Sequence, residues 1–69
     1  MNNEEQLVVS SQYELDEYEK FKHQIVYVGK LEIANGVLEV YHNYLYQFKY
    51  YYINNVLVNV VRTKIEKGE

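Results

Sequence analysis

The sequence predicts an α+β fold in which an N-terminal helix packs on a strongly bent antiparallel β-sheet of three or four strands, built from two consecutive hairpins. Apolar residues recur at helical spacing over residues 12–23, and the period then changes to two. Two turn dipeptides, Asn35-Gly36 and Asn54-Asn55, interrupt this alternation and divide it into hairpins. These three observations define the expected elements.

The chain has 69 residues, so residues 1–69 are expected to form a single small domain, with residues 1–6 frayed. A chain of this length buries only about 60% of the surface that it exposes when unfolded. Small domains often compensate with disulfides, but this chain contains no cysteine. We therefore expect self-association, most simply as a homodimer.

The first expected element is a helix over residues 12–23. Ser11 and Glu14 match a capping box, in which each side chain satisfies a free backbone N–H of the first turn. The apolar positions of the helix are Leu15, Tyr18, Phe21 (or Lys22) and Ile25. Before the helix, the apolar residues 7–9 fit either an edge strand or the lead-in to the helix.

The first hairpin is expected to join a strand over residues 25–34 to a second strand beginning at residue 37. Asn-Gly suits a two-residue type I′ turn, whose central residues both need positive φ. This register pairs Ile33 with Leu38 and Leu31 with Val40 on one face. It also sets Glu32 opposite Glu39, an unfavourable like-charge pair that Lys30 would relieve diagonally.

The second hairpin is expected to turn at Asn54-Asn55, because asparagine tolerates positive φ better than other non-glycine residues. The expected pairs are Tyr52 with Leu57, Tyr50 with Asn59, Phe48 with Val61, Tyr46 with Thr63 and Tyr44 with Ile65. One face of this hairpin is then almost entirely aromatic and aliphatic. The other face is apolar near the turn and basic at the end of the hairpin that lies far from the turn.

The connection between the hairpins has two interpretations. Even-numbered positions from Leu38 to Tyr52 form an unbroken period-two stripe, which favours one long strand over residues 37–53 that bends near His42-Asn43. The alternative is a tight turn at His42-Asn43 in a four-stranded meander, which would move Leu38 to the face that carries Lys49. The last strand is expected over residues 56–65.

No residue pattern indicates an active site, a metal site or a cofactor, and we expect a protein that is not an enzyme. Ser11 is explained by its capping role. Glu39 and His42 are three apart on a strand and therefore point to opposite faces. His23 and His42 have no cysteine companions with zinc-site spacing, so no metal is expected.

The charge distribution supports an alternative function as a module that binds single-stranded nucleic acid. Residues 1–19 carry six acidic and no basic groups, whereas residues 20–69 carry seven basic and four acidic groups. In the predicted register, cations and an aromatic ring share one sheet face and would contact phosphates and bases: Lys49, Tyr51, Arg62 and Lys64. An isoelectric point near 5.3 counts against this hypothesis, because nucleic-acid-binding domains are usually basic. A further alternative is that the acidic segment 1–19 mimics nucleic acid and blocks a protein that binds it.

The aromatic stripe of the second hairpin is interpreted mainly as core beneath the helix. A helix of about twelve residues is only about 18 Å long, so it would leave part of an apolar sheet uncovered. The expected protein interface is the tip of the second hairpin, where both faces are apolar; it is made of Tyr51, Ile53, Val56 and Val58. The preferred function is that of a small, homodimeric, non-enzymatic interaction or regulatory protein, whose partner is a second copy or a larger protein.

The N-terminal residues and the hydropathy of the chain bear on where the protein is located. The first residues lack the basic start and apolar run of a secretory signal, and no apolar stretch approaches the length of a membrane span. A cytoplasmic location is therefore expected. Small proteins of this kind are common in viruses and mobile elements, and such a source is expected on that basis alone.

Overall fold

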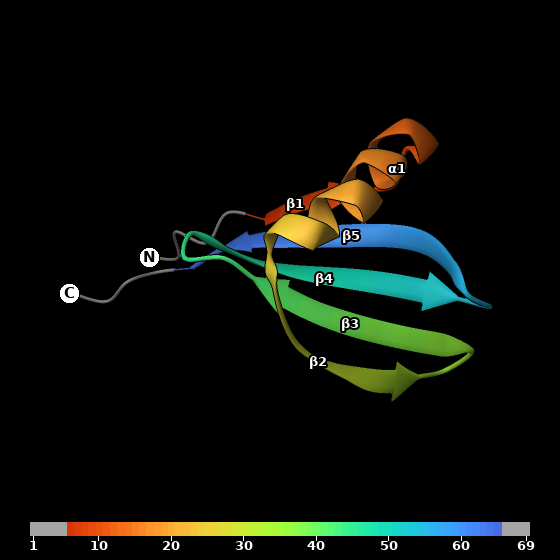
Figure 1. The fold of residues 1–69 in the computed structure, drawn as a ribbon. Coiled ribbons are helices and arrows are strands. Elements are labelled where there is room, and N and C mark those ends of the chain that lie inside the picture. Colours follow the sequence, from red (N-terminus) through yellow and green to blue (C-terminus); the bar gives the residue numbers. More distant parts are fainter. Residues whose placement is uncertain (1–5, 66–69) are drawn as a thin grey trace.

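The computed structural model describes residues 6–65 and has an α+β fold (Figure 1). Its elements are β1 (Gln6–Val9), α1 (Gln12–Phe21), the 3₁₀ turn η1 (Lys22–Gln24), β2 (Val26–Ile33), β3 (Gly36–His42), β4 (Tyr46–Ile53) and β5 (Val56–Lys64). The five strands form one antiparallel sheet in the order β1-β5-β4-β3-β2. The sheet therefore has five strands and not three or four. Neither helix within residues 6–65 has the length and apolarity needed to cross a membrane.

The helix begins where the sequence predicts. The Ser11 side chain accepts a hydrogen bond from the Glu14 backbone N–H at 3.4 Å, which satisfies one free donor of the first turn. The expected segment 12–23 is divided, because the α-helix ends at Phe21 and the chain continues as η1. Since β1 and β2 are the two edges of the sheet, α1 connects opposite edges across one face.

The apolar residues before the helix form the edge strand β1, which accounts for one additional strand. Val9 lies opposite Val60 of β5, and Val8 lies opposite Val61. Of the frayed segment expected over residues 1–6, residues 1–5 lie outside the described residues, and Gln6 belongs to β1.

The prediction of one long strand over residues 37–53 is wrong, and the meander is the arrangement found. The Asn43 side-chain oxygen accepts hydrogen bonds from the backbone N–H groups of Leu45 and Tyr46, at 2.9 and 2.8 Å. The Asn43 N–H in turn donates to the Tyr46 carbonyl oxygen at 3.0 Å. An asparagine side chain that bonds backbone groups two and three residues ahead stabilises a turn, so the strand ends at His42.

The first hairpin has a register two residues away from the prediction. Its turn lies at Ala34-Asn35, where only Asn35 has positive φ (68°), and Leu31 consequently lies opposite Leu38. The face of each side chain from Lys30 to Ile33 is unchanged, because the shift is even. Lys30 lies opposite Glu39, so the expected Glu32–Glu39 like-charge pair does not form.

Gly36 belongs to β3 and not to the turn, and its position against β4 shows why a glycine is needed there. Gly36 lies opposite Ile53 of β4, and a Cβ atom at this position would overlap the backbone carbonyl oxygen of Tyr52. Its φ is not positive, so the close approach of β4 requires glycine here, and the turn conformation does not.

The second hairpin turns where predicted, at Asn54 and Asn55, with φ values of 52° and 68°. The pair Tyr52–Leu57 is also correct. A bulge then shifts the register between Tyr51 and Tyr52, so Tyr50 lies opposite Val60, where Asn59 was expected. A bulge adds one residue to one strand, which reverses the faces of all later positions on β5.

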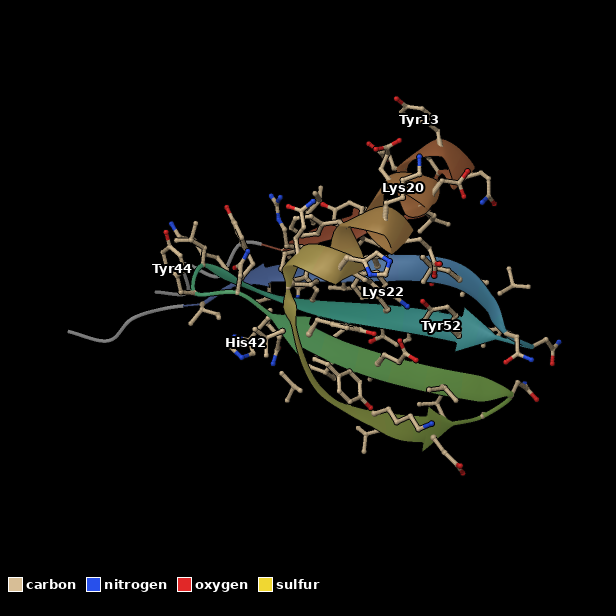
Figure 2. The ribbon with its side chains drawn as sticks, in the orientation of Figure 1. Tyr13, Lys20, Lys22, His42, Tyr44 and Tyr52 are labelled. Atoms are coloured by element: carbon tan, nitrogen blue, oxygen red, sulfur yellow. The ribbon has the colours of Figure 1, made fainter. Side chains whose placement is uncertain are left out.

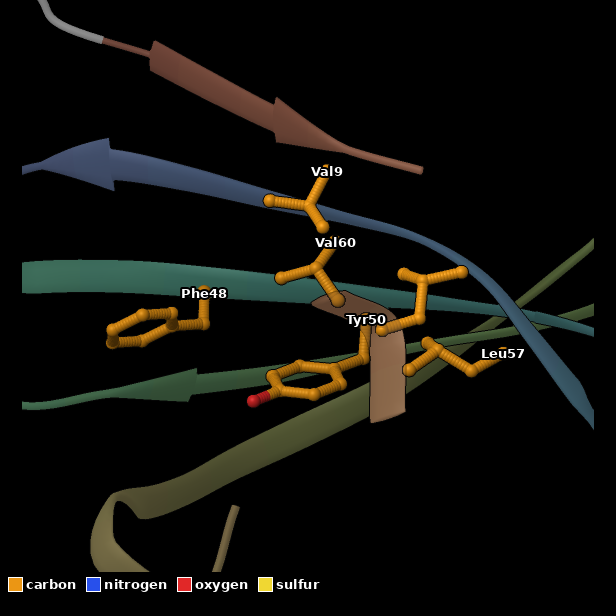
Figure 3. Packing of buried hydrophobic residues seen from close by; sticks show 6 residues of the cluster. Val9, Phe48, Tyr50, Leu57 and Val60 are labelled. Atoms are coloured by element: carbon orange, nitrogen blue, oxygen red, sulfur yellow. The ribbon is translucent and has the colours of Figure 1, made fainter. Parts of the chain in front are cut away.

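The core lies between α1 and the aromatic side of β4. It comprises Val9, Leu15, Phe48, Tyr50, Leu57 and Val60 (Figure 3). Tyr50 is completely buried, and its hydroxyl donates to the Tyr18 carbonyl oxygen of α1 at 2.8 Å. The aromatic stripe predicted as core is therefore covered by the helix at its centre, whereas Tyr44 lies in the β3–β4 turn and is exposed.

Candidate functional site

The sheet has a second face that α1 does not cover, called the open face below. Residues opposite each other on neighbouring strands point to the same side, and successive residues alternate. Because Phe48 and Tyr50 face the core, the odd-numbered positions of β4 belong to the open face. By register, its side chains come from Gln6, Val8, Val26, Leu31, Ile33, Leu38, Val40, His42, Gln47, Lys49, Tyr51, Ile53, Val56, Asn59, Val61 and Thr63.

The open face is predominantly apolar. Leu31, Val8 and Val56 are each more than half exposed, at 62%, 59% and 57%. Leu38 is buried although it does not belong to the core cluster, because it lies between Leu31 and Tyr51 in the register. A group of exposed apolar side chains on one side of a sheet is a candidate surface for contact with another protein.

The residues predicted as a protein interface are largely brought together. Ile53 lies opposite Val56 beside the turn, and Tyr51 follows on the same face opposite Asn59. Val58 has no partner in the register, because it is the extra residue of the bulge. The prediction missed the neighbouring contribution of Leu31 and Leu38. Their period-two pattern was visible, but the interpretation of residues 37–53 as one long strand assigned them to the core face.

The four residues predicted to bind nucleic acid do not share a face. Lys49 and Tyr51 belong to the open face, whereas Arg62 lies opposite Phe48 and Lys64 opposite Tyr46 on the helix side. The Arg62 guanidinium lies 4.3 Å from the centre of the Tyr46 ring. The interpretation of one basic and aromatic face is wrong, because the bulge reverses the orientation of Arg62 and Lys64.

A charged network joins the C-terminal end of α1 to the sheet on the helix side. Lys22 Nζ donates to the Tyr52 hydroxyl at 2.7 Å and lies 3.5 Å from Glu39 Oε1. The Tyr52 hydroxyl donates to Glu19 Oε2 at 2.5 Å, and the Tyr41 hydroxyl donates to Glu39 at 2.9 Å. Figure 2 shows Lys22 and Tyr52 close together between helix and sheet. These five residues are called the Lys22 network below.

The Lys22 ammonium also lies against aromatic rings. Its Nζ is 5.1 Å from the centre of the Tyr52 ring, 5.6 Å from that of Tyr41 and 5.7 Å from that of Tyr50. A cation within about 6 Å of a ring centre is attracted by the electrons of the ring face. The Lys22 Nζ also lies 3.9 Å from Glu19 Oε2. The ammonium is thus held by two carboxylates and three rings, an arrangement that stabilises the contact between helix and sheet.

The tyrosines around Lys22 are held in the neutral form. Burial raises the pKa of the Tyr50 hydroxyl, with a further contribution from Tyr18. Burial also raises the pKa of Tyr52, helped by its hydrogen bond to Glu19, and that of Tyr41, helped by its hydrogen bond to Glu39. Because a carboxylate accepts a bond only from a protonated hydroxyl, these contacts favour the neutral phenol.

An open groove of about 610 Å³ lies beside this network, between α1 and the turn ends of the strands. Asp16, Glu19, Glu39, Lys22 and Lys30 contribute to its walls, so both charge signs are present. Within residues 6–65, no group of three or more histidine, aspartate or glutamate side chains is placed to hold a metal ion. The groove side of the molecule is therefore polar, and the open face is apolar.

Glu39 and His42 were expected to point to opposite faces, and the structure agrees. Glu39 lies opposite Tyr50 on the helix side, and His42 lies opposite Gln47 on the open face. The His42 Nδ1 atom is 3.2 Å from the Asn43 carbonyl oxygen. These two residues therefore do not form an acid–base pair.

Comparison of the chain with protein-family models, with curated proteins and with solved structures gave no match.

Proposed function

We propose that this protein is a non-enzymatic interaction protein, that it forms a homodimer, and that its open face is the surface that binds protein. The observation that carries the proposal is the contrast between the two sides of the sheet. α1 covers the centre of one side, where the core lies, whereas the other side has no helix over it within residues 6–65 and presents Leu31, Val8 and Val56 to solvent. Covering such apolar surface is favourable by about 25 cal/mol for each Å² removed from water.

The alternative function, binding of single-stranded nucleic acid, has less support in this arrangement. Among the residues of the open face within residues 6–65, Lys49 is the only lysine or arginine. Nucleic-acid surfaces combine several cations that follow the phosphate backbone with exposed aromatic rings. One lysine beside Tyr51 does not provide such a track, so protein binding is the function that the geometry supports better.

The proposal is tested by the mass of the protein in solution. Sedimentation equilibrium over protein concentrations from about 1 μM to about 1 mM is expected to show a monomer–dimer equilibrium. Three lysine substitutions then sample different parts of the open face: Val8→Lys at the β1 edge, Val56→Lys at the β5 tip and Leu31→Lys at the β2 edge. At least one of them is expected to shift the equilibrium toward monomer, since a buried lysine without a partner is costly.

Two outcomes would count against the proposal. A wild-type protein that remains monomeric over the whole range would contradict the homodimer. A dimer that all three lysine variants leave unchanged would place association away from the open face. Circular dichroism spectra of the variants serve as the folding control, because all three positions are exposed.

A further inference from the structure

The two edges of the sheet differ in a way that bears on association. Within residues 6–65, β1 covers one edge with four residues, Gln6–Val9, whereas β2 presents eight, Val26–Ile33. An edge strand carries unpaired backbone N–H and C=O groups and can pair with another strand. On β2, the bulge at Val28 disturbs the first half, but the register from Gly29 to Ile33 is regular. This segment is the accessible template for pairing.

The register determines which residues of β2 direct their backbone groups outward. In antiparallel pairs, hydrogen-bonded and non-hydrogen-bonded residue pairs alternate. The pair that closes a two-residue hairpin, here Ile33–Gly36, is of the hydrogen-bonded kind, and so is Leu31–Leu38. The intervening residues Lys30 and Glu32 therefore direct their N–H and C=O groups away from β3, toward the free edge.

The charges of these two residues select one way of pairing β2 with a second β2. A two-fold axis perpendicular to the sheet requires antiparallel pairing centred on one residue. Centring on Lys30 would place two lysines opposite each other, and centring on Glu32 would place two glutamates opposite each other. Centring on Leu31 places Lys30 of each copy opposite Glu32 of the other, which gives two favourable cross-strand pairs.

The same register also suits the side chains of the open face. Leu31 is 62% exposed in the single chain and would lie beside Leu31 of the second copy, next to Leu38 of each. Ile33 would lie opposite Gly29 of the second copy, and a Cβ built on Gly29 meets no atom within 4 Å, so there is room for the isoleucine. Backbone bonding, charge and shape therefore agree on this register.

We infer that a second copy of this chain pairs antiparallel with β2, centred on Leu31, to form a continuous ten-stranded sheet. This inference rests on the proposed homodimer and specifies its contact. Because the axis is perpendicular to the sheet, the open faces of the two copies join into one apolar surface, while Lys30 and Glu32 form ion pairs on the helix side. Lysine on an edge strand ordinarily discourages pairing, but Glu32 neutralises it in this register alone.

The deciding experiment uses charge reversal and mixing. Lys30→Glu gives a chain with two acidic edge residues, and Glu32→Lys gives a chain with two basic ones. Each variant alone is expected to dimerise at least about tenfold more weakly than wild type, because both cross-strand pairs become repulsive. Mixed together, the two variants are expected to form a heterodimer in preference to either homodimer, measured by native mass spectrometry with one chain labelled with ¹⁵N. The double variant Lys30→Glu/Glu32→Lys is expected to regain the wild-type dissociation constant.

Matched controls separate the edge from general charge effects. Lys20→Glu and Glu17→Lys make the same charge changes on the exposed side of α1, and their mixture is expected to show no preference over random association. A second readout is amide hydrogen exchange, in which the N–H groups of Lys30 and Glu32 are expected to become protected as the protein concentration rises. Thermal melting shows whether each variant is folded.

The possible results are distinguishable. A wild-type dimer whose strength is insensitive to both edge reversals, with no protection at Lys30 and Glu32, would overturn the β2 contact and leave the proposed homodimer standing. A wild-type monomer at every concentration would overturn both. Preferential heterodimer formation by the edge variants, absent from the α1 controls, would support the contact centred on Leu31.

Discussion

Lys22, at the end of α1, donates a hydrogen bond of 2.7 Å to the hydroxyl of Tyr52 on β4. The two residues are thirty positions apart in the chain, and the bond joins the end of the helix to β4 at Tyr52, whose side chain packs against the apolar core. The side chain of Lys22 is only 23% exposed, so the ammonium exchanges most of its water for Tyr52, Glu39 and the aromatic rings. This contact therefore contributes to stability, in contrast to an ion pair in full solvent.

The first prediction concerns removal of this ammonium. Lys22→Met keeps an unbranched side chain of similar length but leaves Glu19 and Glu39 without their cation. We expect the free energy of unfolding to fall by about 1–3 kcal/mol, because a partly buried hydrogen bond to a charged group is lost. Urea denaturation monitored by circular dichroism measures the change.

Lys20→Met is the matched control, since Lys20 lies exposed on the same helix. Its effect is expected to stay within about 0.5 kcal/mol of wild type, as for most surface substitutions. Equal effects of the two substitutions would contradict a stabilising role for the Lys22 network.

The second prediction concerns the dependence of stability on alkaline pH. Burial raises the pKa of Tyr50 in the folded protein, so between the unfolded and folded pKa values the folded state binds more protons than the unfolded state. The slope of unfolding free energy against pH is then negative, and stability falls as pH rises above about 10, by up to about 1.4 kcal/mol per pH unit for the buried Tyr50. The raised pKa values of Tyr41 and Tyr52 act in the same direction.

Guanidinium unfolding at a series of pH values measures this dependence. Tyr52→Phe is expected to flatten the alkaline slope, because phenylalanine has no proton to lose. Tyr13→Phe is the control, since Tyr13 is 75% exposed and is expected to leave the slope unchanged. An alkaline slope that is the same in Tyr52→Phe, Tyr13→Phe and wild type would show that Tyr52 does not take part.

The third prediction compares two glycines on neighbouring strands. A methyl group at Gly36 would overlap the Tyr52 carbonyl oxygen, whereas at Gly29 it would meet open space. Gly36→Ala must therefore separate β3 from β4 and is expected to cost about 1–3 kcal/mol. Gly29→Ala is expected to be neutral or slightly stabilising, because alanine loses less backbone entropy on folding. Thermal unfolding of both variants in dilute solution tests the contrast, and similar melting temperatures would contradict it.

Much of the fold could be predicted, because local rules determine it. The helix start follows from the hydrogen bond between Ser11 and Glu14, and the second hairpin turn follows from the tolerance of Asn54 and Asn55 for positive φ. Both depend on residues within three positions of each other. The period-two stripe of β4 likewise predicted that Phe48 and Tyr50 face the helix.

The features that were not predicted each depend on one residue that changes the pairing of residues elsewhere in the sheet. The bulge at Val58 reverses the face of Arg62, and the Gly36 contact with Tyr52 moves the first turn by one position. Both depend on how two strands approach each other, and the periodicity of a single strand does not predict that geometry. The Lys22 network was indicated only weakly, since Lys22 shares the helical spacing of Leu15 and Tyr18.

The fourth prediction concerns Asn43, which divides the apparent long strand into β3 and β4. Its side-chain oxygen accepts bonds from the N–H groups of Leu45 and Tyr46, and the Leu45 carbonyl oxygen in turn accepts the Ile65 N–H at 2.9 Å. The turn therefore also holds the end of β5. Asn43→Ala removes the acceptor for two backbone donors and is expected to cost about 1–2 kcal/mol of unfolding free energy.

Asn43→Asp separates this hydrogen bonding from other effects of the substitution. A carboxylate oxygen can accept the same two bonds, so the aspartate variant is expected to keep nearly the stability of wild type. The Ile65 amide is expected to exchange hydrogen faster in the alanine variant than in the aspartate variant, because loosening the turn weakens its bond to Leu45. If alanine and aspartate destabilise equally, the Asn43 side chain does not set the turn. The division of the stripe would then be due to the pairing of β3 with β4 alone, since that register already places Tyr41 opposite Phe48 and His42 opposite Gln47.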